Sequence, residues 1–331
     1  SKNVDFHYDL TYLDKDGNIK YDRKIWDATY EVVDNAKDYL VIEMFLFNDI
    51  YNKDVDKFPE FAKEYTRRIV KKKMENPNLK VYILSDENNN LYGAFEHPLI
   101  TEMKNAGIDV IDVDIYKLKD TFPWYSPIWR SVIKPFGNPQ GKGWITNFYG
   151  PMWPKLTLRN LFRALNVKAD HRKIFLNEDK VVIASANIHD PSYFHENVAI
   201  SADGEITKDI LRDLQLVAKF SGGNIDVSSE SEVKKPVNIK NFQASKIKFK
   251  EDESLKSDLQ KQVEQIEKNK GNFVDKGTKE FYETGELTKN EDVLQNDDPN
   301  NSYKVQFESE AKIGENLDKD IDSLKAGDEV L

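Results

Sequence analysis

The chain has 331 residues, of which 39% are hydrophobic and 32% charged, and its formal net charge is −10 at pH 7. It contains no cysteine, which excludes disulfides, thiol catalysis and cysteine-ligated metal sites. No apolar run reaches the roughly 18–20 residues that a membrane-spanning helix needs. The first residue is Ser1 rather than Met, so we keep an upstream leader or anchor as one expectation.

Helical and strand patterns alternate in the first third of the chain. The expected elements are a helix over 24–37, a strand over 39–47, a helix over 57–75, a strand over 79–85, a helix over 97–106 and a strand over 108–113. The run over 39–47 is almost continuously apolar, which is typical of a strand buried on both faces. Alternation of this kind indicates β-α-β units. We therefore expect an α/β fold in which helices flank a mostly parallel or mixed β-sheet.

Residues 120–156 interrupt this alternation with a long segment rich in proline and glycine. It contains nine aromatic residues, including four of the five tryptophans. The wider range 121–177 carries nine Lys or Arg and one acid, Asp170, which suits an anionic partner such as a phosphate ester. Such a segment is typical of a surface that faces lipid or of a lid over an active site. A loop folded on a small core of its own is the alternative.

The next part of the chain returns to regular patterns. A helix is expected over 157–165 and another over 206–220, with strands over 171–177, 180–186 and 197–201 between them. Residues 1–221 are therefore expected to form one folded unit.

The composition changes after residue 221. Residues 222–309 are polar and acidic, which predicts a linker or insertion. Lys325–Leu331 repeats the pattern of Asn35–Val41, in which a helix end is followed by Ala-x-Asp and an apolar strand start. Residues 310–331 are therefore expected to begin a second, truncated copy of the unit.

One of the five histidines has neighbours that suit phosphate chemistry. In a strand, His171 and Lys173 would lie on the same side. An imidazole there can attack phosphorus while the ammonium balances the charge of the phosphate. Ser185 and Asn187 follow the next predicted strand and can hydrogen-bond phosphate oxygens. An ordinary β-hairpin with a surface His–Lys pair is the competing interpretation, and the spacing alone does not decide between them.

Taken together, these residues resemble the HKD signature of the phospholipase D superfamily. The matching pattern is His171-x-Lys173, then Glu178-Asp179, then Ser185-x-Asn187. Residues 41–49, 141–145 and 187–190 are also similar to a bacterial phospholipase D-like family related to cardiolipin synthases, and the likeness covers about residues 5–220. The usual acid of the signature is an Asp five positions after the Lys, whereas Glu178 holds that position here. The chain carries one such signature, whereas the superfamily brings two together.

The resemblance implies a fold, a set of site residues and a mechanism. The fold is one half of a phospholipase D-like α-β-α sandwich, over residues 1–221. The implied residues are His171, Lys173 and Asn187 for catalysis, and Ser185, Glu178, Asp179 and His195 for substrate binding. The mechanism is a two-step displacement through a phosphohistidine, with a second histidine from the missing half or a partner chain. No metal or cofactor is implied.

The resemblance also implies a function, with two alternatives. The first expectation is a phosphodiesterase or cardiolipin synthase-like transferase that acts on phospholipid at a membrane surface, on the extracytoplasmic face of a bacterial membrane. The first alternative is a homodimeric endonuclease of the same superfamily, because basic and aromatic residues also suit nucleic acid; we favour nucleic acid less. The second alternative is an inactive half that binds phosphate-bearing surfaces or membranes.

Overall fold

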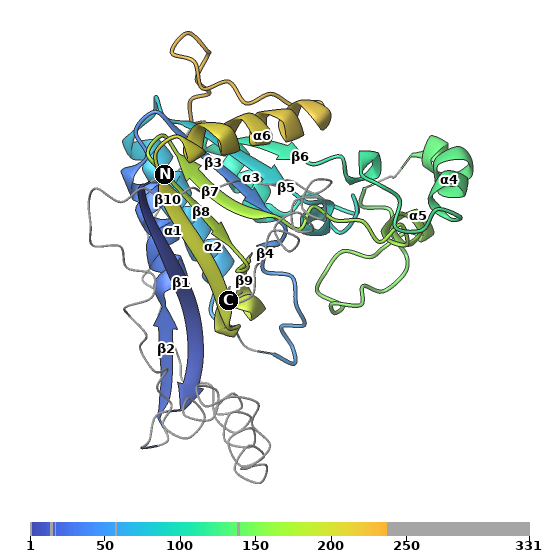
Figure 1. Ribbon diagram of the computed structural model, residues 1–331. Helices are drawn as coiled ribbons and strands as arrows, with labels where there is room; N and C mark the ends of the chain where they lie inside the picture. Colours follow the sequence, from blue (N-terminus) through green and yellow to red (C-terminus); the bar gives the residue numbers. More distant parts are fainter. Residues whose placement is uncertain (1, 14–15, 17, 57, 138–139, 237–331) are drawn as a thin grey trace, which may run out of the picture.

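The computed structural model describes residues 2–13, 16, 18–56, 58–137 and 140–236 (Figure 1). The predicted linker beyond residue 236 and the predicted second unit at 310–331 lie outside these residues.

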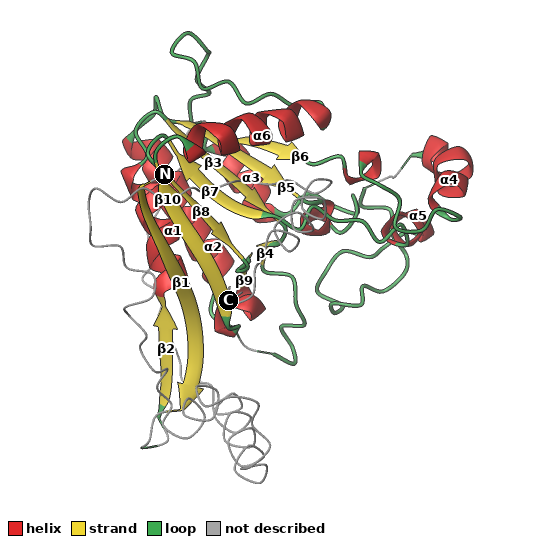
Figure 2. Cartoon of the chain, viewed as in Figure 1, coloured by secondary structure: helices red, strands yellow, loops and turns green. Residues whose placement is uncertain are grey.

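Strands and helices alternate through most of the described chain (Figure 2). The strands are β1 (Lys2–Leu13), β2 (Ile19–Arg23), β3 (Tyr39–Met44), β4 (Phe47–Asn48), β5 (Lys80–Ser85), β6 (Asp109–Asp112), β7 (Lys173–Asn177), β8 (Lys180–Ala184), β9 (Ile188–His189) and β10 (Asn197–Asp203). The helices are α1 (Lys24–Asn35), α2 (Phe61–Glu75), α3 (Pro98–Asn105), α4 (Ser126–Ile128), α5 (Leu158–Ala164) and α6 (Ile206–Phe220). The elements expected from residue 24 onward are confirmed, with ends displaced by a few residues.

Eight strands form one mixed sheet in the order β2-β1-β10-β8-β7-β3-β5-β6. Only the neighbours β3, β5 and β6 pair in parallel, because α2 and α3 carry the chain back between them. The other pairs in this sheet are antiparallel. The expected mixed α/β sheet is confirmed, but its parallel part is confined to three strands.

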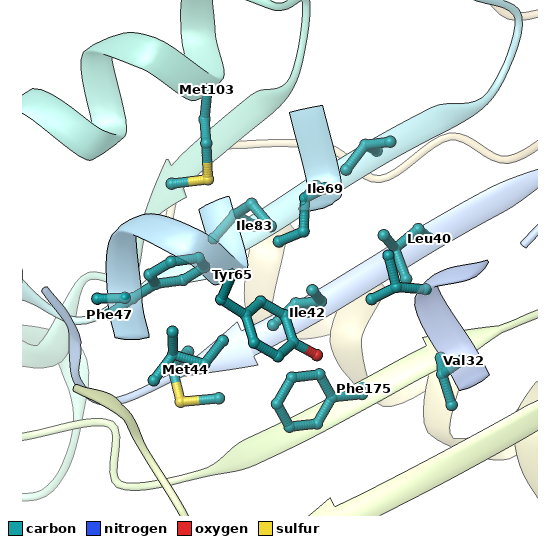
Figure 3. Close-up of a cluster of buried hydrophobic side chains, with 14 of the residues drawn as sticks. Val32, Leu40, Ile42, Met44, Phe47, Tyr65, Ile69, Ile83, Met103 and Phe175 are labelled. Carbon is teal, nitrogen blue, oxygen red and sulfur yellow. The ribbon is translucent and has the colours of Figure 1, made fainter. Parts of the chain in front are cut away.

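Helices cover both faces of this sheet. Along β3, Leu40, Ile42 and Met44 point into a core shared with α1, α2 and α3 (Figure 3), while Tyr39 and Val41 point into a second core shared with α6. Burial of each large apolar side chain contributes about 1.5–3 kcal/mol. This explains why the sequence of β3 is apolar on both faces.

The sequence analysis assigned no element to residues 2–23, where β1 and β2 form an antiparallel hairpin that pairs with β10. The alternation of apolar and polar residues along β1 is the period of a strand, and the sequence analysis overlooked it. One of the polar residues, Asp9, is buried and accepts a hydrogen bond of 2.9 Å from the backbone N–H of Ile25. Burial raises the pKa of Asp9 to about 7. A polar side chain therefore fixes the start of α1 to the sheet.

Residues 120–137 and 140–168 form a side lobe that lies apart from the sheet and contains α4 and α5 (Figure 1, right). Helical backbone continues past α4 to Phe136 through a π-helical and a 3₁₀ turn. The lobe is attached by Trp129, which is buried and stacks on Tyr116 with 4.6 Å between ring centroids. No helix among the described residues is long and apolar enough to cross a membrane.

Candidate active site

Several strands of the large sheet end side by side where the site forms. Met44 at the end of β3 pairs with Ser85 of β5 and with Lys173 of β7. Ala184 at the end of β8 pairs with Ala199 of β10. Here β3 lies between a parallel and an antiparallel neighbour. In open α/β sheets, ligands bind at the carboxyl ends of strands where the strand order reverses.

His171 lies just before β7 and has an exposed side chain. The strand begins at Lys173, two residues later than expected, so the two residues do not share a strand face. The His171 ring packs against Phe45, with 4.6 Å between ring centroids. Desolvation lowers the pKa of His171 and the charge of Lys173 lowers it further, against an opposing effect of Asp170. The imidazole is therefore neutral near pH 7, as a nucleophile must be.

Lys173 is buried, and its ammonium folds back toward His171. Nζ donates a hydrogen bond of 2.5 Å to the backbone oxygen of His171 and lies 5.0 Å from the centroid of the Phe45 ring. Burial lowers the pKa of Lys173 to about 8, although Asp170 and Asp86 oppose the shift. The ammonium thus fixes the His171 main chain and supplies a positive charge beside the imidazole.

Ser185 and Asn187 follow β8 and lie at the same end of the sheet. Ser185 Oγ donates to Asn197 Oδ1 at 2.9 Å and accepts from the backbone N–H of Val198 at 3.0 Å. Asn187 Oδ1 accepts from the backbone N–H of Leu46 at 3.4 Å. Both side chains are therefore fixed by neighbouring strand ends. Hydroxyl and amide groups of this kind hydrogen-bond phosphate oxygens.

His195 lies just before β10 and is exposed. Its backbone oxygen accepts a hydrogen bond of 3.2 Å from Asn197 Nδ2, and Asn197 in turn contacts Ser185. The structure therefore brings His195 to the same end of the sheet. Asn197 is a site residue that the sequence analysis missed, and its only signal was its position at the start of a strand.

Glu178 and Asp179 lie at the opposite end of the sheet, in the turn between β7 and β8. Glu178 accepts hydrogen bonds from the backbone N–H groups of Lys37, Asp38 and Tyr39 at 2.8, 3.4 and 3.5 Å. The structure does not bring these two acids, for which substrate binding was predicted, to the end of the sheet that holds His171, because residues 174–177 of β7 separate them from Lys173. They join the β7–β8 turn to the start of β3.

Arg172, the middle residue of the motif, belongs to a buried ion-pair cluster. Its guanidinium contacts Glu43 at 2.7 Å, Asp213 of α6 at 2.5 Å and Asp170 at 3.4 Å. Burial and the charge of Asp170 raise the pKa of Glu43 well above its usual value, against the effect of Arg172. The cluster therefore fixes Arg172 both to the sheet, through Glu43 of β3, and to the helix layer, through Asp213 of α6. In the sequence, the only hint of this cluster was Glu43, a single acid inside an apolar strand.

Asp86 at the end of β5 supports the same loop. It accepts a hydrogen bond of 2.6 Å from the backbone N–H of Asp170. Burial raises the pKa of Asp86 to about 7. Three residues after β3, the backbone N–H of Phe47 donates to Asn89 Oδ1 at 2.7 Å, and Asn89 Nδ2 donates to the Phe45 oxygen at 3.1 Å. These contacts fix the segment before β7, which contains His171, and the segment after β3, which contains Phe45.

The remaining histidines are engaged in the fold. The shortest polar contacts of their rings are His7 Nε2 to Ser201 Oγ at 2.8 Å, His97 Nε2 to Asp49 Oδ1 at 2.9 Å, and His189 Nε2 to Ile50 O at 3.2 Å. Across the described residues, no group of three or more His, Cys, Asp or Glu side chains could hold a metal ion. The donors at the sheet end are imidazole, ammonium, hydroxyl and amide groups, a set that suits an anion.

Searches against protein-family profiles and against curated proteins find no match. Among solved structures, the chain is similar to Nuc, a phospholipase D family member from Salmonella typhimurium, at 13% identity and a TM-score of 0.33 over 65% of this chain and 93% of Nuc. It is similar to NucT from Helicobacter pylori at 12% identity and a TM-score of 0.31, over 67% of this chain and 99% of NucT. It is also similar to the phosphatidylserine synthase of Haemophilus influenzae Rd KW20 at 13% identity and a TM-score of 0.35, over 64% of this chain and 36% of the synthase.

Proposed function

We propose that the chain is a phospholipase D-like phosphodiesterase or phosphatidyltransferase that acts on phospholipids. One observation supports this proposal above all others. An exposed, neutral His171 lies at the same end of the sheet as Lys173, Ser185 and Asn187. The pattern that resembles the HKD signature supports it independently.

The chemistry is a double displacement at phosphorus. A ring nitrogen of His171 attacks the phosphodiester, a P–N bond forms, and the bond from phosphorus to the leaving alcohol breaks. The leaving oxygen takes a proton from a general acid. Water or a second alcohol then gives its proton to that group and attacks phosphorus, which breaks the P–N bond and frees His171. Lys173, Ser185 and Asn187 balance the charge on the phosphate oxygens.

The general acid in this proposal is a histidine of a second half or a second copy of the chain. An uncovered apolar part of the sheet supports such a partner. Phe6, Ile183, Val198 and Ile200 share the α6 face but lie beyond the cover of the helix, and they are 37–50% exposed. Val198 pairs with Ser185, so this surface begins at the site. His195 is the alternative source within the chain.

The side lobe favours phospholipid over a soluble diester as the substrate. Its exposed apolar side chains and its excess of Lys and Arg suit a headgroup interface. We accordingly propose a membrane-associated protein, on the extracytoplasmic face of a bacterial membrane. The absence of cysteine is compatible with that location.

The decisive experiment compares the wild-type chain with His171→Ala on phosphatidylglycerol vesicles and on plasmid DNA. We expect phosphatidic acid or cardiolipin from the wild type and none from the variant. Mass spectrometry of the quenched reaction should find a phosphatidyl group on the peptide that contains His171. Product that survives the substitution would overturn the proposal.

The same assay separates the alternatives. Cleavage of DNA without turnover of lipid would identify an endonuclease. Turnover of neither, together with a monomeric mass in solution, would identify an inactive half that binds phosphate-bearing surfaces. His195→Ala tests the source of the acid: loss of activity in this variant would place the acid within the chain.

A further inference from the structure

We propose that the side lobe, residues 120–137 and 140–168, docks onto an anionic lipid bilayer and inserts two apolar helix stripes into it. This inference deepens the proposed function and rests on it for the choice of phospholipid as the partner. It assigns the membrane contact to particular side chains, whose exposure is shown by the structure.

The first stripe begins in the turn before α4 and continues along the helical segment that follows it. Trp124, Ile128, Val132 and Phe136 follow one another at intervals of four residues, and their exposed fractions are 71%, 57%, 60% and 73%. Residues four apart lie on one face of a helix. The adjacent face carries Tyr125, Trp129 and Ile133, which pack against the core shared with α6. The segment is therefore apolar on two sides, and only one of them is covered.

The second stripe lies on α5. Leu158, Phe162 and Leu165 are spaced at intervals of four and three residues, and their exposed fractions are 48%, 37% and 52%. Asn160 on the other side is buried and completes a capping box with Thr157. Leu161 also packs inward, against a small core that contains Leu91 and Leu156, so α5 is apolar on its covered side and on its exposed side.

Exposed apolar residues are concentrated in this lobe. Of the 21 large hydrophobic residues that are exposed in the described chain, 13 lie between residues 122 and 167. A soluble monomer seldom exposes so many contiguous apolar side chains unless they form an interaction surface.

The charge of the lobe identifies the partner as anionic. Residues 121–169 contain seven Lys or Arg and no Asp or Glu. Lys134, Lys142 and Lys155 are exposed beside the apolar stripes. A bilayer with anionic headgroups offers hydrocarbon and negative charge to one surface, and amphipathic helices with this combination lie in the interface plane.

The same surface suits nucleic acid less well. Bases bind without sequence preference by stacking on aromatic rings. Six of the 13 exposed residues are aliphatic and cannot stack; these are Ile128, Val132, Met152, Leu158, Leu165 and Val167. Hydrocarbon accepts aliphatic and aromatic side chains alike, so a bilayer accounts for the whole set.

Ion pairs connect the lobe to the catalytic end of the sheet. Within the lobe, Arg130 binds Asp120 through two contacts of 2.7 Å and Lys168 binds the same carboxylate at 2.7 Å, which holds the two ends of the lobe together. Arg163 of α5 forms an ion pair with Glu87, which is adjacent to Asp86. Docking of the lobe would therefore hold the site at the level of the lipid phosphates.

The test measures binding of the full chain to vesicles of phosphatidylglycerol with phosphatidylcholine, and to vesicles of phosphatidylcholine alone. His171→Ala is present in every protein, so that no lipid is consumed. Trp124 and Trp144 are 71% and 67% exposed, so insertion should shift the tryptophan emission to the blue and allow quenching by brominated lipid. Trp124→Phe with Trp144→Phe should remove most of this signal while vesicles still sediment with the protein.

The stripe is tested with Ile128→Ser and Val132→Ser combined. We expect partitioning to weaken about tenfold or more, since burial of each aliphatic side chain contributes more than a factor of ten. The matched control combines Val55→Ser and Leu216→Ser, which are 73% and 65% exposed but lie outside the lobe, and it should bind as the parent does. Lys134→Glu with Lys142→Glu should reduce the preference for phosphatidylglycerol.

The outcomes separate this inference from the proposed function. If the wild-type chain hydrolyses a soluble diester such as bis(p-nitrophenyl) phosphate but does not bind vesicles, the membrane inference is wrong. Vesicle binding that depends on the stripe, without turnover of any diester, would support the lobe and contradict the proposed activity. The inference would be overturned if the stripe and control variants lost vesicle binding equally. It would also be overturned if the chain bound single-stranded DNA through the stripe but did not bind vesicles.

Discussion

The two ends of the β7–β8 hairpin lie in one continuous sheet but have different roles. At the turn, Glu178 accepts hydrogen bonds from three backbone N–H groups that lead into β3. At the open end, His171 and Ser185 have exposed side chains and Lys173 is a buried cation with a depressed pKa. The acid of the turn binds backbone donors, whereas the open end combines an exposed imidazole with a partly desolvated cation, as the proposed function requires.

This difference teaches which polar residues of a motif belong to a site. A carboxylate that is occupied by backbone donors has little capacity left for a substrate. Lys173 is partly desolvated and its pKa is lowered to about 8, which is a stability cost that the fold tolerates. Substitutions at the two ends should therefore separate activity from stability.

The largest effect is expected for His171→Ala. Loss of a nucleophile should lower kcat by about 10³-fold or more, if the proposed reaction is correct. The melting temperature should change little, because the side chain is exposed. Turnover of phosphatidylglycerol and thermal unfolding measure the two effects. A large fall in melting temperature would indicate that His171 is part of the fold instead.

Arg172→Ala should lower stability strongly, unlike His171→Ala, because it leaves Glu43 buried without its cation. Breaking a buried ion pair in this way destabilises a protein by about 3–5 kcal/mol. Urea unfolding monitored by tryptophan fluorescence measures this loss. Arg212→Ala on the exposed face of α6 is the matched control, and it should cost less than about 1 kcal/mol.

A double variant checks the cause of the Arg172 effect. Arg172→Met with Glu43→Gln removes the cation together with the most deeply buried of its three acids, so part of the lost stability should return. If the double variant is no more stable than Arg172→Ala, the cluster does not act through its charges.

Much of the helix and strand order could be predicted because burial imposes simple periods on the sequence. The apolar run of β3 and the stripe of α6 both indicated their elements and faces. β1 was missed although apolar and polar residues alternate along it, and its faces are the reverse of the usual order, since Asp9 and Thr11 on the polar side are buried while Phe6 is exposed. Its strand conformation depends on pairing with β10, which is nearly 200 residues away in the sequence.

The site was predictable only where it is local in sequence. His171 and Lys173 are two residues apart, and Ser185 and Asn187 follow the next strand. Asp86 and Asn197 reach the same place through the sheet register, which the sequence does not encode as a pattern. The error on Glu178 arose because proximity in sequence does not distinguish the two ends of a hairpin.

The pH dependence of kcat/KM should show two limbs that belong to the open end. Because the nucleophile must be neutral, the rate should fall about tenfold per pH unit below the pKa of His171, which is lowered from 6.5. Because Lys173 must be charged, the rate should also fall as the pH rises through about 8. In Lys173→Arg the part of the alkaline limb that comes from Lys173 should disappear, since arginine keeps its proton, and the limb of the general-acid histidine should remain. An unchanged alkaline limb in that variant would assign it to another group.

The lowered pKa of Lys173 also predicts how the stability of the fold changes with pH. The pKa of Lys173 is about 8 in the folded protein and 10.5 without burial. Between these values the unfolded chain binds more protons than the folded one, so stability should rise with pH across this window. Lys173→Met should flatten the trend in thermal unfolding measured from pH 7 to pH 10.

The smallest effects are expected at the turn. Glu178→Ala removes the acceptor of three backbone N–H groups and should cost about 0.5–1.5 kcal/mol. Asp179→Ala is the neighbouring control: it breaks only an exposed 3.6 Å ion pair with Lys37 and should cost about 0–0.5 kcal/mol. Neither variant should change kcat, because both side chains lie at the far end of β7 from Lys173. A tenfold loss of kcat in Glu178→Ala at unchanged stability would return this acid to the catalytic site and contradict the separation of the two hairpin ends.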